Sequence, residues 1–278
     1  MVVRAVKEKA VVAVKNAKPE NVAVLNDSRP RHDMNDQQNL FHYIGVQAKL
    51  IKELGPKVHR KLGEEDVHKL WVATRRARAA FWVIKHSSVP TRFDKLESLL
   101  KALGKDLGNV RELDVAFRDA DHFKMKRSSL GGQRKSALKR LKKITVQSAI
   151  DRIGKQFEAA EKSLMEAGPI LLGRPNEVLK VKLEDCAKGS AHGKKARHKL
   201  RTALRKVRYS LEAIGRPVAP LNHIIKALGD AHDLERLQAF LHKKGKVRTE
   251  QKALNAQVKH LSLPALHYAV KQLEKDPH

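Results

Sequence analysis

The sequence is poor in cysteine and in aromatic residues. Its 278 residues include one cysteine, Cys186, and only 4% are aromatic. A single cysteine excludes a disulfide within the chain, which suits a reducing compartment and predicts a cytoplasmic protein. Because aromatic side chains are scarce, we expect a core of Leu, Val, Ile and Ala, which with Lys, Arg and Glu favour helix over sheet.

Long apolar runs are also absent. No stretch reaches the 18 or more apolar residues that a membrane-spanning helix needs, so no membrane span is predicted. The N-terminal residues mix apolar and basic side chains, without the continuous apolar region of a secretory signal. We expect residues 1–36 to form a flexible basic arm and residues 37–278 to form the folded domain.

Acidic residues are too few to balance the basic ones. The chain has 58 Lys and Arg against 30 Asp and Glu, which gives a formal net charge of +28. Self-repulsion of this size opposes a compact state unless an anion is bound. The charge therefore indicates a polyanionic partner: a nucleic acid, an acidic membrane surface or another polyanion.

One basic pattern occurs twice. It reads HKLWVATRRAR from His68 to Arg78 and HKLRTALRKVR from His198 to Arg208. Since each helical residue turns by about 100°, offsets of 0, +3, +7 and +10 fall on one stripe roughly 80° wide. The two stripes are His68, Trp71, Arg75 and Arg78, and His198, Arg201, Arg205 and Arg208. We expect helices from Glu64 to about Lys85 and from Lys194 to Ile214, each with a cationic stripe beside an apolar one.

A second pattern recurs further along each half. Leu107–Leu113, LGNVREL, aligns residue for residue with Leu228–Leu234, LGDAHDL. In this alignment Arg111 corresponds to His232. Just upstream, Lys105 corresponds to Lys226. In each copy we expect the glycine to end one helix and the next residue, Asn109 or Asp230, to cap another.

Two motifs in the same order in each half indicate an internal duplication with a period of about 120 to 130 residues, too long for a solenoid. We predict an all-α fold of two pseudo-symmetric four-helix bundles in one compact domain. The first repeat is expected at about residues 37–130, with its first helix at Leu40–Leu62. The second is expected at about residues 134–275 and opens on one long helix, Ser136–Ala167.

The run from Val67 to Arg78 resembles the signature helix of CHAD domains, the conserved-histidine α-helical domains, whose usual pattern is V-H-x-x-R-V-A-T-R-R-x-R. Leu107–Val115 is similar to the turn that follows that helix. The second half matches the partner pattern at His198, Arg201, Arg205, Lys206, Arg208, Tyr209 and Glu212, and then at Leu228–Leu234. The sequence departs from the pattern at Trp71, where the family usually has Arg, and at Glu112, where Asp is commoner. The resemblance covers about residues 37–275.

The resemblance implies two four-helix bundles around a basic central groove or pore that binds inorganic polyphosphate. It also implies association with polyphosphate or storage granules. Related domains occur fused to triphosphate tunnel enzymes, which are β-barrels with an E-x-E-x-K strand, and this chain has neither feature. We therefore expect a stand-alone, non-catalytic binding module.

Polyphosphate offers closely spaced charges and no bases, so binding it requires lining cations and should depend steeply on salt. Arginine supplies a bidentate fork for phosphate oxygens, and lysine supplies a point charge. Few acids lie within the motif helices to neutralise these cations. The residues predicted to bind polyphosphate are His68, Arg75, Arg76, Arg78, Lys105, Arg111, His198, Arg201, Arg205, Lys206, Arg208, Lys226 and His232.

The two motif histidines admit three interpretations. Each could be a phosphate contact that strengthens on protonation, or a neutral histidine that donates one N–H to phosphate. Each could instead be a half-buried side chain satisfied by a backbone group or by a carboxylate such as Glu112 or Asp233. The sequence leaves these open for both His68 and His198.

Two other function classes remain open. A nucleic-acid-binding protein of the nucleoid type would account for the charge, although few aromatic residues are available to stack on bases. An enzyme or accessory module of polyphosphate or triphosphate metabolism would need carboxylates that converge on a divalent metal. No Gly-rich phosphate loop, G-x-S-x-G or H-E-x-x-H pattern is present, so we expect no catalysis, cofactor or metal site.

Overall fold

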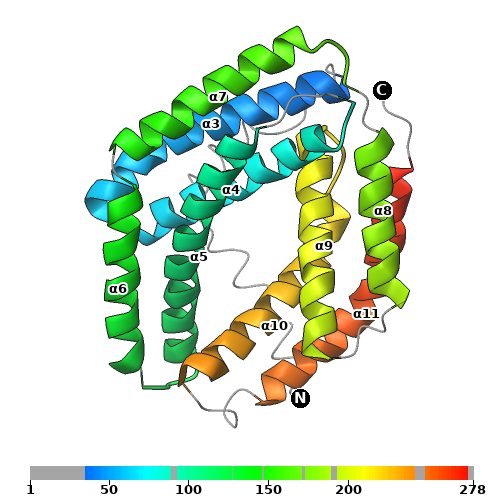
Figure 1. The fold of residues 1–278 in the computed structure, drawn as a ribbon. Coiled ribbons are helices and arrows are strands. Elements are labelled where there is room, and N and C mark those ends of the chain that lie inside the picture. Colours follow the sequence, from blue (N-terminus) through cyan, green and yellow to red (C-terminus); the bar gives the residue numbers. More distant parts are fainter. Residues whose placement is uncertain are drawn as a thin grey trace.

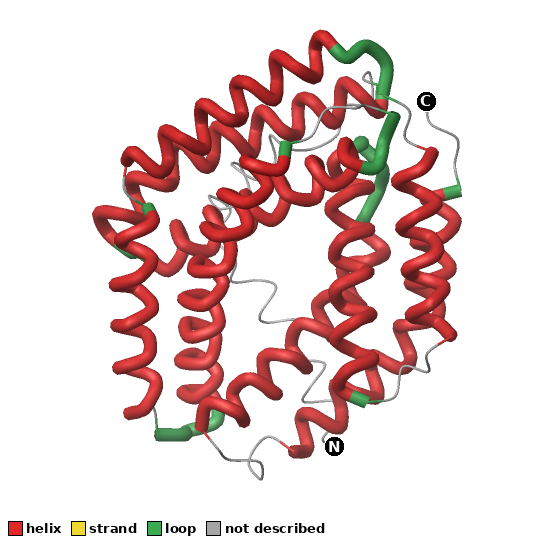
Figure 2. Tube along the Cα trace, in the orientation of Figure 1, coloured by secondary structure: helices red, strands yellow, loops and turns green. Residues whose placement is uncertain are grey.

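The computed structural model describes residues 35–88, 93–126, 128–145, 147–170, 173–188, 193–241 and 248–274. Every element within these ranges is helical (Figure 2), which confirms the predicted all-α class. The α-helices are α3 (Asp36–Lys61), α4 (Glu64–Lys85), α5 (Asp94–His122), α6 (Ser128–Ile144), α7 (Gln147–Glu166), α8 (Gly173–Lys188), α9 (Lys194–Ala213), α10 (Asn222–Leu241) and α11 (Arg248–Leu273). A 3-10 turn, η1 (Ala219–Leu221), leads into α10.

Four helices form a closed ring at the centre of the molecule. α4 packs on α5, α5 on α10, α10 on α9, and α9 on α4, so the contacts return to their starting point (Figure 1). Outer helices support this ring: α3 packs on α4, α6 on α5, α8 on α9, and α11 on α10. α7 lies along α3. Both basic motifs are therefore carried by ring helices, the first by α4 and the second by α9.

The core is one continuous cluster of mainly aliphatic side chains, as the composition predicts. Tyr43 and Phe81 are the largest fully buried residues, and most of the rest are Leu, Ile, Val and Ala. Phe81 makes an edge contact with Phe93 at 5.3 Å between ring centroids and a tilted contact with Phe157 at 5.7 Å. The few aromatic residues thus join α4 to the start of α5 and to α7.

The first helix begins earlier than predicted. Asn35 caps α3 through a capping box, in which its side chain accepts from the backbone N–H of Gln38 (2.8 Å) and its own N–H donates to the Gln38 side chain (2.9 Å). Asp36 is buried and accepts from Arg216 at 3.1 Å. Asn35 and Asp36, predicted to belong to a flexible arm, are therefore the N-terminal cap and the first residue of α3, and the rest of that predicted arm, residues 1–34, lies outside the described ranges.

The predicted turns at Gly108 and Gly229 are wrong. α5 continues without a break through Gly108, and α10 continues through Gly229. Gly108 has a packing role instead, because a Cβ at this position would lie 3.2 Å from Nε1 of Trp71. Glycine there allows the Trp71 indole on α4 to approach the backbone of α5 closely. The pair of a glycine and a capping residue looks the same in the sequence in both cases. The glycine can end a helix, or it can lie inside a helix where a neighbouring side chain packs closely against the backbone.

The predicted single helix Ser136–Ala167 is also wrong, because α6 ends at Ile144 and α7 begins at Gln147. Thr145 follows α6 as a buried residue whose hydroxyl donates to the carbonyl of Leu141 (3.0 Å). α7 then packs along α3, where Ile150 fits over Gly55. A Cβ on Gly55 would lie 2.6 Å from that side chain. The sequence pattern is continuous for a helix, but packing on α3 favours a chain that turns between α6 and α7.

Candidate functional site

The two motif helices pack directly against each other, and both lie close to their predicted bounds. Their apolar positions, such as Leu70 on α4 and Leu204 on α9, are fully buried. The cationic stripes lie beside these buried faces. Packing of the apolar faces therefore brings cations of the first motif next to cations of the second.

Trp71 is the residue around which the two stripes meet. The guanidinium carbon of Arg75 lies 4.4 Å from the centre of its indole ring, and that of Arg205 lies 5.9 Å from it. Arg75 also lies 5.5 Å from the ring centre of Tyr209 on α9. Stacking on aromatic faces holds a guanidinium in place and leaves its N–H donors available. Trp71, at a position where the resemblance implies Arg, thus serves as a platform for arginines of both motifs.

An inner charge cluster, which we define as Arg75, Arg201, Arg205, His232 and Asp233, joins α4, α9 and α10. Burial lowers the pKa of Arg205 to about 9, and the nearby guanidiniums of Arg75 and Arg201 contribute to this shift. Burial lowers the pKa of Arg201 as well, and Arg75 lowers it further. These arginines remain cationic near neutral pH, but their mutual repulsion is substantial. An anion between them would relieve it.

Two further members of the cluster are on α10. Burial raises the pKa of Asp233 to about 6, with Asp119 and Asp230 adding to the shift and Arg201 opposing it. Burial and the charge of Arg201 lower the pKa of His232 to about 3, so His232 is neutral in the physiological range. A neutral imidazole can still donate one N–H to an anion.

The motif histidines occupy different environments. His68 is half-buried beside Trp71, with 6.2 Å between ring centres, and its Nδ1 is buried without a hydrogen-bond partner among the described residues. Burial lowers the pKa of His68, and Arg111 lowers it further, which keeps this imidazole neutral. His198 is exposed, and its ring centre lies 5.9 Å from that of His232.

Arg76 is separated from the other motif arginines. It is buried and donates from Nη2 to Oε1 of Glu212, which forms an ion pair between α4 and α9. It shares this interior region with Tyr43 of α3, because the charges of Glu212 and Arg76 both act on the pKa of the Tyr43 hydroxyl. The structure therefore gives Arg76 a place in the interface between the motif helices.

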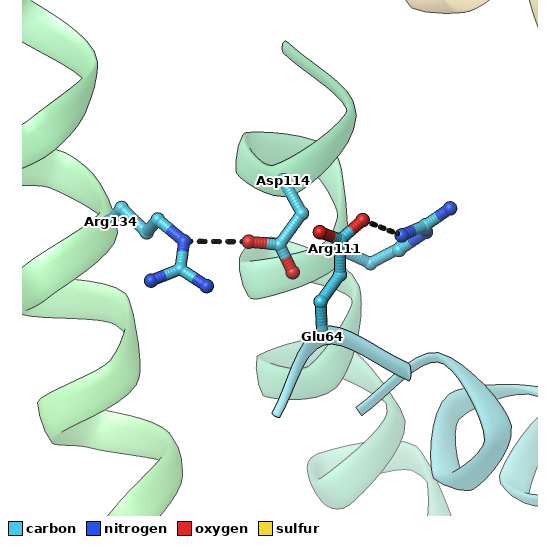
Figure 3. Close-up of polar contacts among 4 residues, drawn as sticks. All are labelled: Glu64, Arg111, Asp114 and Arg134. Atoms are coloured by element: carbon cyan, nitrogen blue, oxygen red, sulfur yellow. Dashed lines mark hydrogen bonds and ion pairs between the residues drawn. The ribbon is translucent and has the colours of Figure 1, made fainter. Parts of the chain in front are cut away.

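Ion pairs connect the middle of α5 to neighbouring helices. Arg111 donates to Glu64 at the start of α4 (2.8 Å), and Arg134 of α6 donates to Asp114 (2.6 Å), as Figure 3 shows. A third pair joins Arg236 of α10 to Glu112 of α5. These contacts tie α5 to α4, α6 and α10. Arg111, predicted to bind phosphate, has an acidic partner here.

The remaining predicted residues occupy different surroundings. Arg78 and Lys206 line a cavity of about 430 Å³ that Arg75 and Arg205 also line. Arg208 is half-buried, with its guanidinium carbon 5.5 Å from the centre of the Tyr209 ring. Lys105 is exposed on α5, whereas Lys226 is exposed on α10 and pairs with Asp230 at 2.5 Å.

Sequence reasoning missed three members of this site. The sequence pattern presents Trp71 as a departure from the usual Arg, Asp233 as a possible carboxylate partner of a motif histidine, and Tyr209 only as part of the second motif. The available signal was the adjacency of Tyr209 to Arg208 in the second motif. That adjacency gives no indication that the ring would reach Arg75 on another helix.

The model of the CHAD domain family matches residues 47–242, well over half of the sequence. The chain belongs to the CHAD domain family. Among solved structures, the CHAD domain from the plant Ricinus communis is 18% identical and superposes with a TM-score of 0.56, over 90% of this chain and 96% of that one. PptA from Streptomyces chartreusis is 19% identical, with a TM-score of 0.46 over 86% and 99% of the two chains. No curated protein matches the sequence significantly.

The likeness to the plant domain supports the fold of this CHAD chain. The described ranges lack two further features. None of their helices combines the length and apolarity that a bilayer span requires. They also contain no group of three or more His, Cys, Asp or Glu side chains arranged to hold a metal ion.

Proposed function

We propose that this CHAD domain binds inorganic polyphosphate on the inner face of the ring, along the junction of α4 and α9. The ligand contacts would be Arg75, Arg201 and Arg205, with His232 as a neutral N–H donor. Arg78, Lys206 and Arg208 would hold adjacent phosphates. Four of the predicted residues are left out of this set. Arg76 is buried with Glu212, and Lys105 is exposed on α5. Arg111 and Lys226 each pair with an acid already.

The observation that carries this proposal is the crowding of guanidiniums from both motifs around Trp71. Arg75 and Arg205 come from different halves of the chain, yet both lie within 6 Å of one indole centre. Like charges gathered around one side chain and partly removed from water raise the free energy of the empty site. A linear polyanion supplies several negative charges in a row and removes that cost, without any need for base recognition.

We also propose that the ring results from internal duplication and has a pseudo-twofold arrangement. The contact pattern supports this: α3 on α4 corresponds to α8 on α9, α4 on α5 to α9 on α10, and α5 on α6 to α10 on α11. The equivalent helices α4 and α9 meet each other, as do α5 and α10. α6 and α7 pack mainly on α3 and α5, so we place the residues from 134 to 166 with the first half.

In this proposal the protein binds polyphosphate without cleaving it. We expect it to be located where the polymer is, including cytoplasmic polyphosphate granules. The sequence has none of the catalytic patterns considered above. A phosphate-release assay with magnesium and long-chain polyphosphate tests this part. Release above the rate of a heat-denatured sample would contradict it.

The binding proposal is tested by filter binding of long-chain polyphosphate across a series of salt concentrations. R75Q and R205Q should each weaken binding about tenfold or more, the range for a charge-assisted contact. Each should also reduce the dependence of log Kd on log salt by about one. R152Q, which removes an exposed arginine of α7, is the matched control. It should leave the affinity and its salt dependence almost unchanged, because salt screens the effect of one distant exposed charge.

RNA at equal charge concentration is the discriminating competitor. We expect polyphosphate to displace RNA, because the inner charge cluster offers cations and few aromatic faces for bases. Equal affinity for both polymers would instead support a nucleic-acid-binding protein and overturn the proposal.

A further inference from the structure

Two lysines from different helices share the indole of Trp82, near the C-terminal end of α4. Nζ of Lys206 on α9 lies 4.4 Å from the indole centre, and Nζ of Lys182 on α8 lies 5.4 Å from it. The imidazole of His86 stacks on the same side chain, with 4.2 Å between ring centres. Three helices thus position two ammonium groups on one aromatic side chain.

The two ammonium groups repel each other. Burial lowers the pKa of Lys206 to about 8, and the charge of Lys182 is the next largest cause. Neither lysine forms an ion pair with a carboxylate in the described part of the chain. A cation–π contact compensates only part of the cost of bringing two like charges together. Such a pair is suited to an anion that both can contact.

A cavity joins Trp82 and Lys206 to two arginines of the inner charge cluster, and Lys182 contacts the same Trp82 indole. The cavity of about 430 Å³ is lined by Arg75 and Arg205 and also by Trp82 and Lys206. Arg78 and Lys101 add two more cations to its wall. The two acids in the wall, Asp94 and Glu97, each lie 3.5 Å from Lys85, which neutralises part of their charge. The cavity therefore offers a mostly cationic path away from Trp71.

We propose that Trp82, Lys182 and Lys206 form a second phosphate-binding subsite, which holds the part of a polyphosphate chain that extends from the inner charge cluster. This inference rests on the proposed function, and it adds two residues, Trp82 and Lys182, that neither the motifs nor the family match assign. The subsite selects for length, because a short polyphosphate bound at Trp71 ends before it reaches Lys182.

Lysine suits such a subsite better than arginine does. Its ammonium is a compact point charge with three donors, so it follows phosphates that pass in varied orientations. The indole limits the motion of both lysines and excludes water from one side of them. A base stacked on Trp82 is the competing explanation, and the experiment below separates it from phosphate binding.

The chain has two tryptophans, which provides one reporter for each site. The W71F protein reports only Trp82, and the W82F protein reports only Trp71. With long-chain polyphosphate at saturation, as set by filter binding of each variant, emission should change in both proteins. With tripolyphosphate, emission should change in W82F alone.

K182Q is the second arm of the test. It should weaken binding of long-chain polyphosphate about two- to fivefold at low salt, the range for one exposed charge contact. It should leave tripolyphosphate binding unchanged. K180Q is the matched control, because Lys180 is on the same helix and pairs with Glu274 at 2.5 Å. It should leave both affinities unchanged.

The outcomes distinguish the two proposals. If Trp71 responds to long-chain polyphosphate but Trp82 does not, or if K182Q matches K180Q, the second subsite is wrong and the proposed function stands. If filter binding shows no retention of polyphosphate by the unmodified protein, the proposed function is wrong. If Trp82 responds to RNA but not to polyphosphate, the subsite binds bases and the phosphate assignment is wrong.

A folding defect in W71F would not end the test. Amine labelling of the unmodified protein, read by mass spectrometry, compares Lys182 and Lys206 with Lys180. Long-chain polyphosphate should protect the first two and leave Lys180 reactive. Equal protection of all three would contradict a defined subsite.

Discussion

At the scale of single residues, neighbours in the sequence have unrelated roles. Arg75 stacks on Trp71 and faces the second motif, whereas Arg76 is buried with Glu212. A rotation of about 100° between consecutive helical residues separates the inner face of the ring from the interface between helices. The charge of a side chain is therefore a poor guide to its function until its direction is known.

Asp233 provides a pH-dependent prediction at this scale. Its carboxyl, with a pKa of about 6, faces Arg201 and Arg205 on α9, Asp119 on α5 and Asp230 on α10. Above pH 6 the carboxylate is charged and repels a polyanion. Below pH 6 it is neutral, so polyphosphate affinity should rise as pH falls from 7 to 5. A bound polyanion raises this pKa further, so binding near pH 6 should take up protons.

D233N tests that prediction by mimicking the neutral form. At pH 7.5 it should bind polyphosphate on the order of three- to tenfold more tightly, the effect of one partly screened charge. It should also lose most of the pH dependence between 5 and 7. Titrations of D151N, on α7, should follow those of the unmodified protein. Lys206, with a pKa of about 8, titrates outside this window.

At the scale of helices, contacts between motif elements determine which side chains meet. The α4–α9 junction combines buried apolar positions with the Arg76–Glu212 pair. Nε and Nη1 of Arg76 and Oε2 of Glu212 are buried without hydrogen-bond partners in the described ranges. Glu212 is therefore the only described counter-charge shown in contact with Arg76, and the pair connects the two halves of the ring.

Removal of one partner of the Arg76–Glu212 pair should destabilise the protein. E212Q leaves Arg76 buried without a counter-charge, so the free energy of unfolding should fall by about 3–5 kcal/mol. The double variant R76M/E212L replaces both charges by apolar side chains and should recover most of this loss. Denaturant unfolding measures both effects. If E212Q is as stable as the unmodified protein, the pair has no structural role.

The glycines of the repeated pattern provide a second test at this scale. A Cβ on Gly229 meets nothing within 4 Å, so G229A should stabilise α10 by up to about 1 kcal/mol. A Cβ on Gly108 lies 3.2 Å from Nε1 of Trp71 and would displace the indole. G108A should therefore be less stable than G229A by about 1 kcal/mol and should bind polyphosphate more weakly. Thermal unfolding and filter binding compare the two, and equal stability would show that Trp71 does not depend on Gly108.

At the scale of the whole molecule, the net charge of +28 opposes the compact ring. Salt should raise the melting temperature of the free protein by screening this repulsion. Long-chain polyphosphate at about 100 times its Kd should raise the free energy of unfolding by about 2.7 kcal/mol and the melting temperature by about 5–10 °C. Scanning calorimetry measures the shift. The same shift with polyglutamate of equal charge would indicate a general charge effect and contradict a specific site.

The sequence alone determined the helical class, the two motif helices and their cationic stripes. These features follow from local periodicity and composition, which a single helix displays regardless of its neighbours. The ends of the helices were harder to predict from the sequence. Gly108 and Gly229 match a capping pattern, yet both lie inside continuous helices because packing supports the longer forms.

The tertiary structure alone decided how the site is assembled. Ring closure brings Arg75 of α4, Arg205 of α9 and Asp233 of α10 into one charge cluster, although long stretches of sequence separate them. It also decided that Trp71 is a platform and that Arg76 belongs to the interior. The physical reason is that burial and like-charge proximity depend on which faces of distant helices meet, and no local pattern in the sequence specifies that pairing.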